Sequence, residues 1–225
     1  MIMSQTTLIT VREEWQAAWE SAVFRRKTFT GIFSVIAILS AFPFFFQAIE
    51  KRNGILLNDP IMRWLPSHNV SLAIFIIIWA ISLLMMFRAI RSPQLFLTFL
   101  WSYIILLMLR VCTITLVPLE PPAGLVGLVD PFSNFFYGHK FVTKDLFFSG
   151  HTSSVFLIYL CLPNRQDKKL ALIATLAVGF LLLVQHVHYT LDVIGAMAFA
   201  WLARWIALRT VARVHQSENG VTVGE

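Results

Sequence analysis

Charged residues are scarce in this chain. Asp, Glu, Lys and Arg together make up 13% of the 225 residues, whereas hydrophobic residues make up 57%. A soluble domain carries about a quarter charged residues, so this composition excludes an ordinary soluble fold. Several apolar runs reach the ~17–25 residues that a membrane-spanning helix needs. The sequence therefore predicts an all-α, polytopic integral membrane protein.

The chain has only two cysteines. Neither a cleavable signal peptide nor an internal repeat is visible. Cys112 and Cys161 fall in different apolar segments, at what should be opposite membrane faces. We therefore expect them to be small core residues that form no disulfide. Residues 1–27 do not resemble a signal peptide, because charges and tryptophans interrupt each apolar run.

The apolar runs divide the chain into three parts. We expect residues 1–27 to form a cytoplasmic amphipathic segment at the membrane interface, with a mobile tail as the alternative. Residues 28–209 should form a six-helix transmembrane domain, and residues 210–225 a disordered cytoplasmic tail. The six predicted spans are residues 29–49, 70–87, 93–117, 146–162, 170–188 and 190–208.

The distribution of basic residues predicts the orientation of these spans. With the amino terminus inside, twelve Lys and Arg residues lie on the inner side, five on the outer side, and Arg110 within a span. The positive-inside rule then places both termini in the cytoplasm. The net charge of +6 reflects this orientation, and no nucleic acid is expected as a partner.

Polar residues from three separate segments gather at the outer end of the predicted bundle. They are Arg110 in the third span, Ser149-Gly150-His151-Thr152 at the start of the fourth, and His186, His188 and Asp192 between the fifth and sixth. Ionisable groups near lipid are costly, so their convergence indicates a functional site. The alternative is a polar seam that joins helices in a structural or channel-forming protein.

The residue types in this cluster suit phosphoryl transfer. Asp192 lies four residues after His188 and can accept one ring N–H, leaving the other nitrogen free to attack phosphorus. His151 can protonate a leaving alkoxide and later deprotonate an acceptor hydroxyl. This scheme needs neither a metal ion nor another cofactor. As alternatives, the histidines and Asp192 could ligate zinc or iron, or bind haem.

Three further residues could hold the phosphate. Arg110 offers a planar guanidinium whose N–H groups match phosphate oxygens. Ser149 can cap the fourth helix, and Gly150 allows close approach of the backbone. The N–H groups of that first turn would then form an anion site at the outer interface.

Two stretches resemble the catalytic motifs of the sphingomyelin synthase family, within the type-2 phosphatidic acid phosphatase superfamily. They are Asp145-Leu-Phe-Phe-Ser-Gly-His-Thr and His186-Val-His-Tyr-Thr-Leu-Asp-Val-Ile. Arg110 with Thr115 and Pro118 resembles a shorter motif of that family, and Asp59-Pro60 resembles its acidic, proline-containing motif. The similarity extends over about residues 58–200.

The resemblance implies a six-helix core and a double-displacement mechanism on lipid head groups. It implies His188 as the nucleophile, Asp192 as its partner and His151 as the acid/base. Asp145 would recognise a cationic head group or orient a histidine, unless it is only an interfacial helix cap. A phospho-alcohol would pass from a phospholipid donor to a lipid alcohol acceptor, ceramide or diacylglycerol, through a phosphohistidine.

The chain departs from the phosphatase branch of that superfamily. Leu181 and Leu182 stand where that branch has a Ser-Arg pair, and its Lys-x6-Arg-Pro motif is missing. These differences favour a synthase-like transferase. From the orientation predicted above, we expect its site on the extracytoplasmic face of a cell membrane. A hydrolase on the same scaffold is the alternative, and the oligomeric state stays open.

Overall fold

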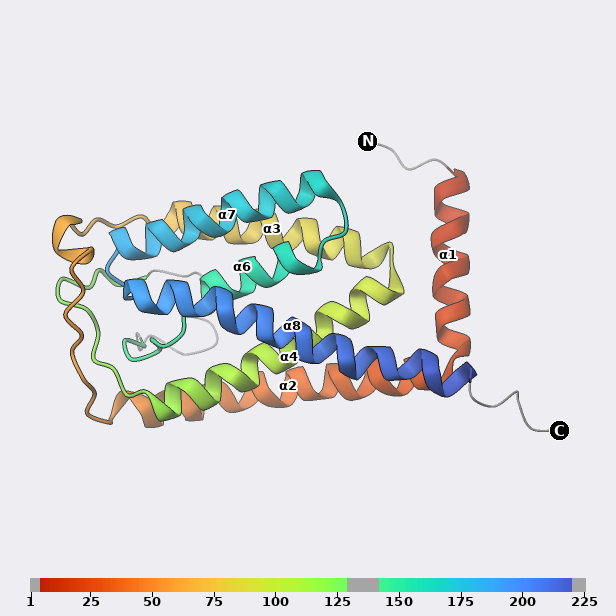
Figure 1. Ribbon diagram of the computed structural model, residues 1–225, viewed down its shortest axis with the longest axis horizontal. Coiled ribbons are helices and arrows are strands. Elements are labelled where there is room, and N and C mark those ends of the chain that lie inside the picture. The colour runs from red at the N-terminus through yellow and green to blue at the C-terminus, as the bar shows by residue number, and fades with distance from the viewer. Residues whose placement is uncertain (1–4, 129–141, 220–225) are drawn as a thin grey trace.

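A computed structural model describes the backbone of residues 5–128 and 142–219, and the side chains of residues 11–128 and 142–211. Within these ranges the fold is helical (Figure 1). Its helices are α1 (Gln5–Glu20), α2 (Ala22–Glu50), α3 (Ser71–Ile90), α4 (Pro93–Leu116), α6 (Gly150–Cys161), α7 (Arg165–Val184) and α8 (Thr190–Asn219), with a short 3₁₀ helix η1 (Met62–Trp64). The apolar stretch between residues 129 and 141 lies outside the described residues.

Six of the helices form an elongated bundle, and α1 lies across one end of it (Figure 1). Both chain termini are at that end, whereas α4 ends and α8 begins at the opposite end. Trp15 fixes α1 to the bundle by donating its indole N–H to the carbonyl oxygen of Ile90, at 2.7 Å. Helix α1 is therefore docked on the bundle, and its location at a cytoplasmic membrane interface stays a prediction.

Four helices are long and apolar enough to cross a membrane: α2, α3, α4 and the part of α8 from Thr190 to Val211. The other two predicted spans form helices but are less clear as spans. Helix α6 has 12 residues, because residues 146–149 are not helical and Ser149 caps the helix. Helix α7 begins with a charged run from Arg165 to Lys169. The count of six spans thus stays a prediction.

Two predicted boundaries are wrong. Helix α7 ends at Val184, so His188 lies in an irregular junction and not on a helix. His186 lies in this break with a φ of 55°, which is incompatible with a right-handed helix. Helix α8 continues to Asn219, so residues 210–219 are helical where we expected a disordered tail. Neither proline nor glycine interrupts residues 196–219.

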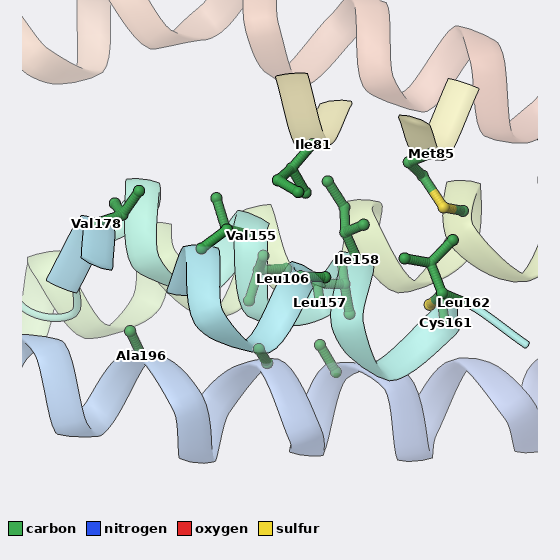
Figure 2. Packing of buried hydrophobic residues seen from close by; sticks show 14 of the residues in the cluster. Ile81, Met85, Leu106, Val155, Leu157, Ile158, Cys161, Leu162, Val178 and Ala196 are labelled. Carbon is green, nitrogen blue, oxygen red and sulfur yellow. The ribbon is translucent and has the colours of Figure 1, made fainter. Parts of the chain in front are cut away.

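The core lies where α3, α4, α6, α7 and α8 meet (Figure 2). Helix α8 contributes a line of fully buried alanines at intervals of three or four residues: Ala196, Ala200, Ala203 and Ala207. Small side chains let helix backbones approach closely, which is how helices pack within a bilayer. Larger residues from the other helices belong to the same buried cluster, among them Ile81, Leu106, Val155 and Val178.

Candidate active site

The junction between α7 and α8 holds a buried histidine–aspartate pair. His188 is 2% exposed and Asp192 is fully buried. Nδ1 of His188 lies 3.3 Å from Oδ2 of Asp192, which also accepts the backbone N–H of Tyr189 at 3.0 Å. Because a carboxylate oxygen only accepts, Nδ1 carries the proton. In the neutral imidazole, Nε2 then has the free lone pair.

The other oxygen of this carboxylate is unusual. Oδ1 of Asp192 is buried, and no donor among the described residues bonds to it. A buried carboxylate with an unsatisfied oxygen is costly and calls for an explanation. Its negative charge is available to offset positive charge on His188, such as the charge that develops when the imidazole attacks an electrophile.

The start of α6 is joined to this pair by the backbone. The N–H of Ser149 donates to the carbonyl oxygen of Asp192 at 3.1 Å, while its hydroxyl accepts the N–H of Thr152 at 3.4 Å. The fully buried Ser149 side chain is therefore a helix cap. The next turn carries His151, whose ring meets that of Phe75 edge-on, with centroids 6.0 Å apart. Two of the predicted segments are thus brought together by one hydrogen bond.

Arg110 is buried beside the same turn. Its guanidinium donates to the carboxylate of Asp145 and to the carbonyl oxygen of Phe148. Gly150 makes this placement feasible, because a Cβ there would lie 2.6 Å from Cζ of Arg110. The third predicted segment therefore also reaches the site.

Arg110 and Asp145, which we predicted as substrate-binding residues, pair with each other. Each charge already has its opposite, at a position where burial makes an unpaired charge expensive. A guanidinium has five N–H groups, so Arg110 retains donors for a phosphate beyond the two that it uses here.

His186 faces away from this cluster. Its Nδ1 lies 2.8 Å from the carbonyl oxygen of Ala123, and its Nε2 lies 2.9 Å from that of Leu65. His186 thus joins two long connections, α2 to α3 and α4 to α6, to the junction. Within the described residues, no three His, Cys, Asp or Glu side chains are placed to hold a metal ion.

Two residues with no predicted role in the site hold the junction in place. The carboxylate of Asp59 accepts the backbone N–H of Thr190 at 2.6 Å and its hydroxyl at 3.1 Å, so Asp59 caps α8 from a distant connection. The hydroxyl of Tyr189 donates to the carbonyl oxygen of Glu120 at 2.9 Å. The motif around Asp59-Pro60 was the only sequence signal that pointed to Asp59. No local spacing indicates its contact with Thr190, because the two residues are 131 positions apart.

The pKa of Asp59 reports these contacts. Burial raises the pKa, but hydrogen bonds from Thr190, Ile61 and Met62 outweigh it and hold the pKa below its ordinary value. The charged form of Asp59 is therefore favoured in the folded protein.

Residues 144–208 match the family described as PAP2 superfamily C-terminal. The matched segment includes Asp145, His151, His188 and Asp192, and it supports the assignment of the chain to the PAP2 superfamily. This match supports an enzyme of the lipid phosphatase or phosphotransferase type. No curated protein matches the chain.

Proposed function

We propose that this protein is a lipid head-group phosphotransferase resembling the sphingomyelin synthases. It would transfer a phospho-alcohol from a glycerophospholipid to ceramide or a similar lipid alcohol and release diacylglycerol. The observation that carries this proposal is the buried His188–Asp192 pair, joined by the Ser149–Asp192 hydrogen bond to the turn that bears His151. This arrangement presents a nucleophile and an acid/base from two adjoining segments.

In the first half-reaction, Nε2 of His188 attacks the phosphorus of the donor phosphodiester. The bond from phosphorus to the glycerol oxygen breaks, and His151 donates a proton to that oxygen, so that diacylglycerol leaves. The phospho-alcohol is now attached to His188. The charge of Asp192 stabilises the cationic imidazole during this step.

In the second half-reaction, His151 removes the proton from the hydroxyl of the acceptor lipid. That oxygen attacks phosphorus, the bond from phosphorus to Nε2 of His188 breaks, and the new phospholipid leaves with both histidines restored. Arg110 would use its remaining N–H groups to hold the phosphate oxygens in both steps.

The proposed setting is a bundle of six spans with its site toward the extracytoplasmic leaflet. Two observations support this setting. The first turn of α8 lies at the opposite end of the bundle from α1 and the termini (Figure 1). The inner connections are also richer in basic residues, twelve against five. The phospholipid donor and the lipid acceptor would both come from the membrane.

The test uses purified protein in vesicles that contain a head-group-labelled phospholipid, with and without ceramide. We expect labelled product and an equal amount of diacylglycerol only when ceramide is present, in the presence of a chelator as well as without it. Equal release of labelled head group without ceramide would show that water is the acceptor and overturn the transferase proposal.

A further inference from the structure

The connection between α2 and α3 exposes large apolar side chains at the outer end of the bundle. They are Ile55, Leu56, Ile61 and Trp64, which we call the apolar rim. Trp64 is 87% exposed, more than Leu72 at 76% on the surface of the candidate span α3. Side chains this apolar are not left in water without reason on an ordered loop.

The opposite side of the same connection is firmly attached to the catalytic junction. Asp59 caps α8 through Thr190, and the N–H of Leu57 donates to the hydroxyl of Tyr189 at 3.3 Å. The carbonyl oxygen of Leu65 meets the ring of His186 at 2.9 Å. Three contacts therefore join this connection to the segment that carries His188, and they hold the apolar rim outward.

The position of the rim indicates its partner. The connection joins two candidate spans, α2 and α3, so it must lie at the membrane boundary. Helix η1 stands at the end of the bundle where α8 begins (Figure 1). Tryptophan is enriched at membrane interfaces, and the exposed Arg63 beside it can meet lipid phosphates.

The rim also borders a cavity. A space of about 430 Å³ lies between the connection and the residues Pro122, Ala123, His186 and Tyr189. Leu56, Met62 and Leu65 supply apolar walls, and Arg63 supplies a positive charge. This volume is within the range of small-molecule sites, and its lining suits the polar end of a phospholipid.

We propose that the apolar rim contacts the lipids of the outer leaflet and thereby positions the junction that carries His188. The lipid contact is independent of the chemistry, whereas the positioning rests on the function proposed above. Contact with a bilayer would favour one arrangement of the connection, and the bonds from Asp59, Leu57 and Leu65 would pass that order to the junction.

The lipid contact is tested by spin-label accessibility in vesicles. In a background with Cys112→Ala and Cys161→Ala, a nitroxide is attached at Trp64→Cys or, as a control in the same connection, at the exposed Asn53→Cys. We expect the label at position 64 to be accessible to oxygen and shielded from a water-soluble nickel complex, and the label at position 53 to show the reverse. Equal exposure of both labels to the nickel complex would overturn the proposal.

The positioning is tested by comparing substrates. Ile61→Ser with Trp64→Ala should lower turnover of phospholipid in vesicles by about tenfold and leave turnover of a soluble short-chain phospholipid unchanged. Ile76→Ala, on the lipid-facing side of α3, is the control and should change neither. Equal loss on both substrates would mean that the rim is only structural. If the unchanged protein turns over no phospholipid, the proposed function fails, but the spin-label result still decides the lipid contact.

Discussion

The two ends of the bundle are stabilised in different ways. At the end near the termini, the connections are short, and a few contacts hold them, such as the ion pair between Arg88 and Asp167 at 2.7 Å. At the other end, the connections are long and many more hydrogen bonds hold them, among them Asp59 to Thr190 and Tyr189 to Glu120. Several of these bonds are made by the residues next to His188.

This difference shows which end of the bundle holds its connections in fixed positions. Long connections lose more conformational entropy than short ones, so ordering them needs many bonds. Glu50 accepts the backbone N–H groups of Thr143 and Lys144, and Lys144 pairs with Glu120 at 2.8 Å. Bonds of this kind keep residues in the fixed positions that a reaction requires. The end that bears α1 has short connections, which need fewer bonds to order them.

The largest expected effect comes from the centre of the outer end. His188→Ala should abolish lipid turnover, because no other group could form the bond to phosphorus. Labelled phospholipid assays measure it, with His68→Ala as the control, since His68 is an exposed histidine of an outer connection. Turnover at the wild-type rate in His188→Ala would show that His188 is not the nucleophile.

His151→Ala should have the next largest effect. Loss of an acid/base group costs roughly 10²–10⁴-fold in rate. Folding should be intact, since the His151 side chain is only partly buried. The rate of head-group transfer measures the loss, and a leaving group that needs no protonation should recover much of it. No recovery would indicate a structural role for His151.

Two glycine substitutions compare the ends directly. Gly150→Ala would place a methyl group 2.6 Å from the buried guanidinium of Arg110, which cannot move without losing Asp145 and Phe148. We expect activity to fall by about one to two orders of magnitude, in line with a displaced positioning group. Gly31→Ala meets the flexible end of Leu100 at 2.7 Å, so that side chain can rotate away. Equal loss in both variants would contradict the contrast between the ends.

Much of this outer end could be predicted from the sequence, for identifiable reasons. The contact between His188 and Asp192 was predicted from their spacing of four residues on a helix. His188 is not helical, but the contact still forms, because Tyr189 and Asp192 form the turn that begins α8. The contact between the start of α6 and this turn was predicted from the expected membrane topology. The sequence could not predict that Arg110 pairs with Asp145, since burial decides whether a charge meets substrate or protein.

The roles of Asp59 and His186 were beyond prediction for another reason. Both join segments that are far apart in the chain, so no local residue spacing indicates their contacts, and only the motif around Asp59-Pro60 pointed to Asp59. We predicted a disordered tail over residues 210–225. Helix α8 continues through residues 210–219, because each added helical residue costs little once a helix has formed.

A smaller effect is expected from the cap of α8. Asp59→Ala should lower the free energy of unfolding by about 1 kcal/mol, the usual value of a helix cap. The pKa of Asp59 is lowered in the folded state, so its contribution is complete above the ordinary value of 3.8 and is lost as the pH falls through the lower folded value. Thermal unfolding in detergent should therefore show a gap between wild type and variant at neutral pH that closes in acid. A gap that is constant with pH would contradict this role.

The smallest effect should come from the inner end. Arg88→Gln removes an ion pair whose side chains are 30% and 12% exposed, so water already screens part of it. We expect a loss of no more than about 1 kcal/mol in unfolding free energy and no change in lipid turnover. Combining Arg88→Gln with Asp59→Ala should give additive losses, because the two sites lie at opposite ends of the bundle and share no partner. A loss of turnover in Arg88→Gln alone would mean that the inner end also controls the geometry around His188, and the distinction between the ends would fail.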